Sequence, residues 1–298
     1  MTAPMPKTAV NFAVPPGACD CHVHVVGDPA RYPMVAGRVY TPPPAPAEEL
    51  SRLLQSLHLD RVVIIQPSFY GTDNSATLDG MHALGPKRAR GVAVIDERTP
   101  AAALKAMADA GMRGLRLNLE TAGETDPVAS LHKLQAGIAW AQPLGWHVQI
   151  YARLSLIAAL ADDIARSPVT LVFDHFAGAT AALGLEQAGF AAVLALIRAG
   201  KAYCKISGAY RVSKRGPDYG DAAPLAKALI AANSERILWG TDWPHSDSSR
   251  PPGRAATDVT PYQPIDDGRL LNELPAWSPD AAIRHKILVD NPARLYGF

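Results

Sequence analysis

Short runs of apolar and β-branched residues alternate with longer amphipathic segments from one end of the chain to the other. Eight of these runs have the length and composition of buried β-strands. They cover residues 20–25, 61–67, 91–95, 114–119, 147–151, 170–175, 202–207 and 237–243. Their regular alternation with other segments predicts parallel strands joined by crossovers.

The segments between these runs have the spacing of amphipathic helices, and several end in glycine, which helix ends favour. They cover residues 47–57, 74–84, 100–111, 128–145, 154–167, 185–200, 221–233 and 280–298. Eight β/α units in about 250 residues predict an α/β protein of the (β/α)8 (TIM) barrel class with a single domain. A doubly wound sheet would need a G-x-G-x-x-G turn, and "HVHVVGDPARYP" after the first strand has none. Residues 1–17 are predicted to be an irregular lead-in, and residues 18–298 the barrel.

The composition limits the partners. The 298 residues carry a net charge of +1 with no basic run, so nucleic acid is not an expected partner. A membrane is not expected either, because no apolar run approaches the roughly 18 residues of a span. Prolines interrupt the first 18 residues, where a signal peptide is continuously apolar, which predicts a cytoplasmic protein. Cys19, Cys21 and Cys204 form no C-x-x-C pair, which argues against a disulfide framework or a zinc ribbon.

Polar side chains stand at the ends of several predicted strands. His22 and His24 share one face of the first strand, His175 ends the sixth, and Asp242 lies at the end of the eighth. In a barrel these ends meet at one mouth, where active sites are built. One strand histidine is more often packed than functional, but three histidines and an aspartate are hard to explain by packing. Long connections at residues 27–46 and 244–264 are predicted to wall this mouth.

Several motifs carry a family resemblance. The stretches "DCHVHV", "GLRLNL", "WGTDWPH" and "DNPARLYGF" resemble the amidohydrolase superfamily over nearly the whole chain. The runs "RVYTP", "GWHVQIY" and "SGAYRVS" are most similar to its branch of 2-pyrone-4,6-dicarboxylate lactonases and sugar-acid lactone hydrolases and isomerases. The resemblance implies a hydrolase of aromatic degradation that opens the lactone of a small anionic carboxylate such as 2-pyrone-4,6-dicarboxylate.

The chain departs from the dinuclear members of this superfamily. They use a carboxylated lysine after strand four and a histidine after strand five, whereas this chain reads "RLNLE" and has Tyr151. His22, His24, His175 and Asp242 remain, and this set could hold one Zn²⁺ or Mn²⁺. The resemblance to the pyrone lactonases implies a site that works without a metal. We therefore expect no cofactor, with one divalent metal as the alternative.

These residues indicate a mechanism. Asp242 is the only carboxylate in the group, so we assign it as the general base that takes a proton from water and delivers it to the leaving ring oxygen. His22, His24 and His175 would polarise the carbonyl by donating hydrogen bonds or positive charge to its oxygen.

Arginines indicate an anionic substrate. Arg116 points toward the predicted mouth, and a buried cation is costly unless it meets an anion, for which a carboxylate is the natural partner. The resemblance further implies that Arg211 binds a carboxylate and that Tyr40, Ser68 and Tyr151 contact the substrate.

The segment after strand four, "NLETAGETD", lacks a basic residue that the dicarboxylate enzymes carry there. The clamp for a second carboxylate is therefore weak unless Arg153, Arg31 or Arg38 replaces it from another loop. A monocarboxylate or sugar-acid lactone becomes a competing substrate.

Other functions stay open at this point. A sugar-acid lactone isomerase would use the same groups, as would a mononuclear metal-dependent hydrolase or decarboxylase. A carrier that only binds an organic acid would not need Asp242. His245 could contact the substrate or line the rim. Outer helices of such barrels commonly form homo-oligomers, although no segment here marks an interface.

Overall fold

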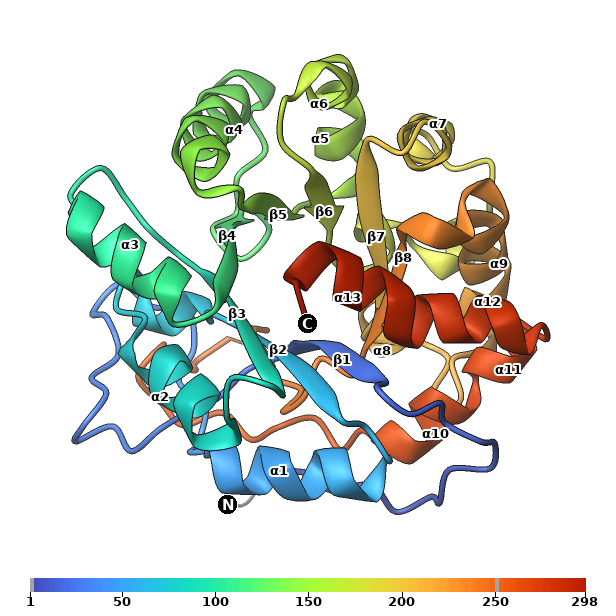
Figure 1. Cartoon of the computed structure of the whole chain (residues 1–298), viewed down its shortest axis with the longest axis horizontal. Helices are drawn as coiled ribbons and strands as arrows, with labels where there is room; N and C mark the ends of the chain where they lie inside the picture. The colour runs from blue at the N-terminus through green and yellow to red at the C-terminus, as the bar shows by residue number, and fades with distance from the viewer. Residues whose placement is uncertain (1–2, 250–251) are drawn as a thin grey trace.

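The computed structural model describes residues 3–249 and 252–298, and its eight parallel strands form a barrel (Figure 1). The strands are β1 (Cys19–Val23), β2 (Arg61–Ile65), β3 (Ala89–Ala93), β4 (Met112–Asn118), β5 (His147–Tyr151), β6 (Leu171–Phe173), β7 (Ala202–Ser207) and β8 (Ile237–Gly240). Each strand pairs with the next in sequence. Beyond β8 the Asp242 amide donates to the His22 carbonyl and the His24 amide to the Trp243 carbonyl, which closes the barrel. The predicted (β/α)8 barrel is confirmed.

Helices surround the strands (Figure 1). They are α1 (Ala47–Ser56), α2 (Ser75–Leu84), α3 (Ala101–Asp109), α4 (Pro127–Ala141), α5 (Leu154–Ala159), α6 (Ala161–Arg166), α7 (Phe190–Arg198), α8 (Ala209–Val212), α9 (Ala223–Ala232), α10 (Asp267–Asn272), α11 (Leu274–Trp277), α12 (Ala281–His285) and α13 (Asn291–Tyr296). A π-helical turn over Lys286–Asp290 joins α12 to α13.

Several helices differ in their bounds from the sequence prediction, and for three of them the reason is visible in the structure. The helix expected over 185–200 begins at Phe190, because Gly189 has a φ of 93°, outside the helical region. The helix expected over 128–145 ends as α4 at Ala141 and is followed by a short 3-10 turn that contains Pro143, which lacks the amide a longer helix would use. The segment 154–167 is divided at Leu160 into α5 and α6.

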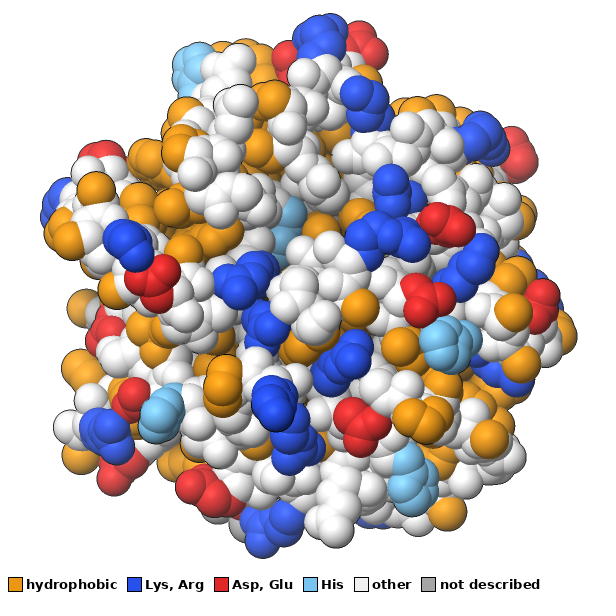
Figure 2. All heavy atoms as spheres, viewed as in Figure 1, with side chains coloured by type: hydrophobic (Ala, Val, Ile, Leu, Met, Phe, Trp, Pro, Cys, Tyr) orange, Lys and Arg blue, Asp and Glu red, His pale blue; other side chains and the backbone are white. Residues whose placement is uncertain are grey.

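The C-terminal helix α13 covers the end of the barrel where the strands begin (Figure 1). Tyr296 is fully buried, and its ring centre lies 5.4 Å from that of His147 at the start of β5. Arg90 of β3 donates to the carbonyls of Tyr296 and Gly297. Figure 2 views this closed face, on which Lys and Arg side chains lie among apolar and uncharged groups. A site inside the barrel therefore opens at the opposite end, where the strands end.

The segment before β1 contains no helix or strand over residues 3–17. The Thr8 hydroxyl donates to Asp266, and the Trp243 indole donates to the Pro4 carbonyl. These contacts tie the segment to the connection that follows β8.

The structure can be compared with two expectations from the composition, one about membrane-spanning helices and one about the cysteines. In the described part of the chain, no helix has both the length and the apolar character that crossing a bilayer requires. The thiols of Cys19, Cys21 and Cys204 are free and buried.

The buried imidazole of His147 makes stability depend on pH. Burial lowers the pKa of His147 to about 3, and its ring nitrogens have no hydrogen-bond partner among the described residues. The unfolded chain binds a proton near the ordinary pKa of about 6.5, whereas the folded protein does not. Stability therefore falls as the pH drops from about 6.5 to about 4.

We expect His147→Leu to reduce the slope of unfolding free energy against pH in this window by about 1.4 kcal/mol per pH unit. Urea unfolding at a series of pH values measures the slope. At pH 8 the histidine is neutral in both states, so a difference there reports packing alone. Equal slopes for variant and parent would contradict the prediction.

Candidate active site

Side chains from several strand ends meet at the open mouth of the barrel. His22 lies in β1 and His24 just beyond it, His175 follows β6, and Asp242 follows β8. All four are buried. Asp242 Oδ1 faces the Nε2 atoms of His22, His24 and His175 at 3.5, 3.6 and 3.9 Å. One carboxylate oxygen is thus surrounded by three imidazole nitrogens.

The other oxygen of Asp242 is held by the short helix α8. Oδ2 accepts hydrogen bonds from the Tyr210 hydroxyl at 2.5 Å and from Arg211 Nε. Gly208 precedes this helix with a φ of 56°, and a Cβ there would lie 3.2 Å from Asp242 Oδ2, so glycine allows the close approach. Burial raises the pKa of Asp242, but the Arg211 guanidinium outweighs it and holds the pKa well below its usual range. The carboxylate is therefore ionised at neutral pH.

Each histidine directs Nε2 toward Asp242. His24 Nδ1 lies 2.8 Å from the Ile65 carbonyl, which can only accept, so Nδ1 carries the hydrogen and Nε2 keeps a lone pair. His22 Nδ1 lies 3.2 Å from Asp174 Oδ1 and 3.4 Å from Lys205 Nζ, and His175 Nδ1 lies 3.0 Å from the Ser207 hydroxyl and 3.3 Å from the Ser207 carbonyl. Each of these two nitrogens therefore has both an acceptor and a possible donor beside it. Burial lowers the pKa of all three imidazoles, that of His175 to about 4, so they are neutral near pH 7.

This group of atoms fits one divalent metal. His22 Nε2 and Asp242 Oδ1 are buried and have no hydrogen-bond partner among the described residues. The lone pair of His24 Nε2 faces an ionised carboxylate, and a cation between the two would satisfy both. Imidazole nitrogens and a carboxylate oxygen are ligands that Zn²⁺ accepts, and the Nδ1 contacts are typical of the support around such ligands. The atoms of His22, His24 and Asp242 lie within 4.8 Å of one another, as a shared ion requires.

A second carboxylate lies below the first, inside the barrel. Asp174 is buried, and its Oδ2 accepts from Arg116 Nη2 at 3.2 Å and from Gln149 Nε2 at 3.0 Å. The prediction that Asp242 is the only carboxylate in the group is therefore wrong. Period-two alternation in "TLVFDH" places Asp174 on the inward face with Val172, and this signal could have identified it.

Asp174 also changes the interpretation of Arg116. The sequence predicts that the buried cation of Arg116 needs an anion from the substrate. The structure supplies that anion from within the chain, so the charge of Arg116 no longer requires a substrate carboxylate. Arg116 still lines the space next to Asp242.

Lys205 completes the charged layer inside the barrel. It lies in β7 with no exposed surface, donates to Gln149 Oε1 at 2.7 Å, and lies 3.5 Å from Asp174 Oδ1. Sequence analysis missed this residue, although a lysine in the apolar run "AYCKIS" was a visible signal. Burial lowers the pKa of Lys205, and Asp174 opposes that shift.

The position of His245 resolves the choice left open by the sequence. His245 is fully buried, its Nε2 lies 3.0 Å from Asp267 Oδ2, and its Nδ1 lies 3.4 Å from the Tyr210 hydroxyl. It stands behind Tyr210 and away from the mouth, so it supports the hydroxyl that holds Asp242.

Two adjoining spaces lie at the mouth. The smaller, of about 20 Å³, is next to Asp242, and both long connections help to wall it, as predicted. Its lining comprises His24, Tyr40, Arg116, Asn118, Thr121, Tyr151, His175, Arg211, Asp242, Ser246 and Ser248. A chamber of about 460 Å³ lies beside it, over the loops that follow β4 to β7, and shares Tyr151, His175 and Arg211. Among the described residues, Ser68 lines neither space and lies close to Tyr40.

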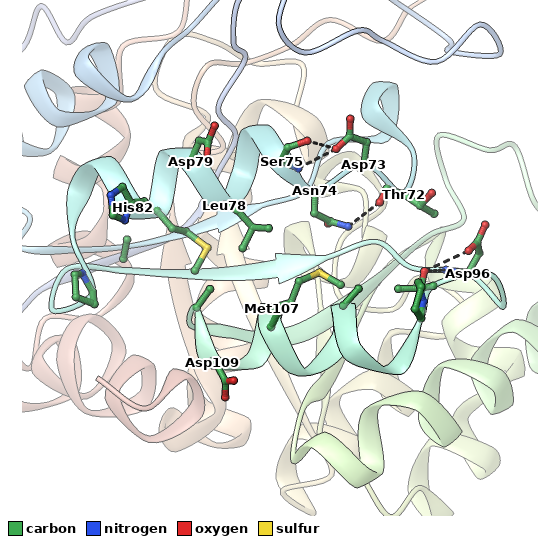
Figure 3. A pocket seen from close by; sticks show the side chains of 18 of the residues that line it. Thr72, Asp73, Asn74, Ser75, Leu78, Asp79, His82, Asp96, Met107 and Asp109 are labelled. Atoms are coloured by element: carbon green, nitrogen blue, oxygen red, sulfur yellow. Dashed lines mark hydrogen bonds between the residues drawn. The ribbon is translucent and has the colours of Figure 1, made fainter.

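A larger cavity lies elsewhere. It measures about 1150 Å³ and lies on the outside of the barrel between α2 and α3 (Figure 3). Leu78 and Met107 face it from these helices, and Asp73 and Asp96 stand at its edge. Its lining includes none of the histidines that surround Asp242. Size therefore does not identify the active site.

Comparison with known proteins shows which family the chain belongs to. A sequence model of the amidohydrolase family matches residues 19–298. The chain belongs to the amidohydrolase family. The resemblance inferred from the sequence motifs is confirmed.

Characterised relatives act on lactones. The 4-sulfomuconolactone hydrolase of Rhizobium radiobacter is 34% identical over 97% of this chain and 92% of its own length. The 2-pyrone-4,6-dicarboxylate hydrolase of Comamonas testosteroni is 34% identical over 96% of this chain and 92% of its length. The D-galactarolactone isomerase of Agrobacterium fabrum is 31% identical, with 97% and 94% covered.

Solved structures agree in fold. An Agrobacterium tumefaciens protein superposes with a TM-score of 0.80 at 30% identity, covering 97% of this chain and 99% of its own. A more distant Burkholderia multivorans amidohydrolase, solved with bound zinc, has a TM-score of 0.66 at 21% identity over 94% and 99% of the two chains. That likeness extends to the fold alone.

The interior charge of Lys205 makes a testable contribution to stability. Lys205→Met leaves Asp174 and Gln149 Oε1 with one partner fewer in a fully buried layer, and we expect a loss of about 3 kcal/mol in the free energy of unfolding. Lys105→Met is the matched control, because Lys105 forms an exposed pair with Asp109 and its loss costs less than about 1 kcal/mol. Urea unfolding measures both, and similar losses would contradict the prediction.

Proposed function

We propose that this protein hydrolyses the lactone ring of a small anionic carboxylate, with Asp242 as the general base. The observation that carries the proposal is the single free oxygen of a buried, ionised carboxylate, directed at three histidine nitrogens. The lactone chemistry of the relatives supports the choice of substrate class.

In the proposed reaction, Asp242 Oδ1 takes a proton from the attacking water and later delivers it to the leaving ring oxygen. Tyr210 and Arg211 hold Oδ2 in place, so only Oδ1 moves a proton. The low pKa of Asp242 keeps it ionised but makes it a weak base, so the water and the carbonyl need polarisation. A divalent ion held by the Nε2 atoms of His22, His24 and His175 would supply that polarisation as a Lewis acid and would leave Asp242 Oδ1 beside it as the base.

Arg211 is the proposed anchor for the substrate carboxylate. Only its Nε is engaged by Asp242, and its side chain is 17% exposed toward the mouth. The remaining guanidinium nitrogens have no partner among the described residues and can donate to a carboxylate, in a space that Tyr151 and Tyr40 flank. This arrangement would set the lactone carbonyl beside His175.

Hydrolysis is favoured over isomerisation by the size of the space next to Asp242. A volume of about 20 Å³ holds one water molecule. In an isomerase the attacking group is a hydroxyl of the substrate itself, and this space would have to admit part of the sugar chain. The isomerase stays the second candidate because one relative carries that activity.

Replacement of the base tests the reaction. We expect the purified protein to open 2-pyrone-4,6-dicarboxylate or 4-sulfomuconolactone, which is measured as the loss of ring absorbance. We expect Asp242→Asn to reduce kcat by about a thousandfold or more. Asparagine keeps the size of the side chain and removes the proton acceptor. Asp79→Asn, in an exposed ion pair outside the site, is the control and keeps full activity. Activity of Asp242→Asn close to that of the control would overturn the assignment.

Metal content tests the proposed ion independently of activity. We expect purified protein to carry about one zinc per chain by elemental analysis and to lose activity after chelation, with recovery on addition of zinc. His24→Gln removes one ligand and lowers zinc affinity by about tenfold or more. His132→Gln on the exposed side of α4 is the control and retains the metal. Full activity in metal-free protein would restore the metal-free mechanism that the sequence resemblance implies.

A further inference from the structure

The 460 Å³ chamber beside Asp242 is where the body of a substrate has to lie. The space next to Asp242 holds one water, whereas the chamber has the volume of a small-molecule pocket. Tyr151, His175 and Arg211 line both spaces and form the boundary between them. A lactone bound with its carbonyl at this boundary would extend into the chamber.

The walls of the chamber combine apolar side chains with polar ones such as Ser155, Thr180 and Gln187. Leu154, Ala179 and Val212 are buried side chains that line it. Leu183 stands at its rim with 66% of its surface exposed, the largest fraction among the exposed large hydrophobic residues of the described chain. A ligand that covers an exposed leucine binds more tightly, because apolar surface leaves contact with water. The apolar part of the wall therefore favours a hydrocarbon group of the ligand.

The cations of the chamber are already paired. Arg153 Nε lies 3.4 Å from Glu120 Oε2, and Arg211 Nε is bound to Asp242. Among the described lining residues no other arginine or lysine is present. A second carboxylate in the chamber would have to displace Glu120 from Arg153.

The other arginines considered from the sequence do not compensate. Arg31 is paired with Asp79, and Arg38 is bound to Thr41, and in the described structure neither lines the chamber or the space next to Asp242. The loop after β4 contributes Thr121 and Glu120 instead of a basic residue. Among the described residues the site thus offers one unpaired guanidinium edge, on Arg211, and a chamber whose own charges, on Arg153 and Glu120, pair with each other.

We propose that the chamber binds an uncharged, mainly apolar substituent of the substrate. The enzyme then prefers lactones with one carboxylate and a neutral carbon chain over lactones with two carboxylates. This inference rests on the proposed lactonase function, which it makes more specific.

The test compares three five-membered lactones that share one carboxymethyl group and differ at one ring carbon, which carries hydrogen, a butyl group or a second carboxylate. We expect kcat/KM for the butyl lactone to exceed that for the unsubstituted lactone by about tenfold or more, because the butyl carbons move from water into contact with the chamber wall. The dicarboxylate is expected to be the poorest substrate. Leu183→Glu should lower the ratio of butyl to unsubstituted kcat/KM by about tenfold. Leu185→Glu is the matched control, because Leu185 lies two residues away and outside the lining, and the ratio stays as in the parent.

Binding separates failure of this inference from failure of the lactonase function. Calorimetric titration with the corresponding open-chain hydroxy acids reports on the chamber even if none of the lactones is opened. Tighter binding of the butyl acid, weakened by Leu183→Glu, supports the chamber whatever the turnover. Turnover of the unsubstituted lactone without any gain from the butyl group, or a preference for the dicarboxylate, would overturn the inference and leave the lactonase function standing.

Discussion

The buried negative charge of Asp242 is the constraint on which the mouth of the barrel depends. A carboxylate removed from water is stable only where cations and hydrogen-bond donors surround it. Tyr210 and Arg211 meet this need at Oδ2, and both come from the four-residue helix α8. Because Gly208 lets that helix approach closely, Oδ2 of Asp242 is engaged, and Oδ1 has no hydrogen-bond partner among the described residues.

His22 connects this carboxylate to a second one. Its Nδ1 lies against Asp174 and its Nε2 faces Asp242, so the orientation of one ring depends on two buried charges. Arg116 and Lys205 balance Asp174 inside the barrel. The interior below the site is therefore a charged layer, and removal of any member leaves a buried charge without its partner. That layer holds the histidine in the orientation that either a metal or a carbonyl requires.

The two sides of the mouth differ because the loops differ. The connections after β1 and β8 close over Asp242 and leave room for one water, whereas the loops after β4 to β7 leave the chamber. The space next to Asp242 and the chamber are thus separate, with Tyr151, His175 and Arg211 at the boundary. Loop variation on a constant barrel is the usual route to new substrates in this fold.

The sequence alone determined the barrel, since eight short apolar runs that alternate with amphipathic segments have one simple parallel solution. It also identified His22, His24, His175 and Asp242, because strand ends share one face of such a barrel. Only the tertiary structure revealed that Asp174 is the partner of Arg116, that Lys205 lies inside the barrel, and that Tyr210 and His245 support Asp242 from behind. These partners come from strands and loops far apart in the chain. Pattern and spacing report which face a side chain occupies, but the charge that meets it across the barrel depends on how all eight strands pack.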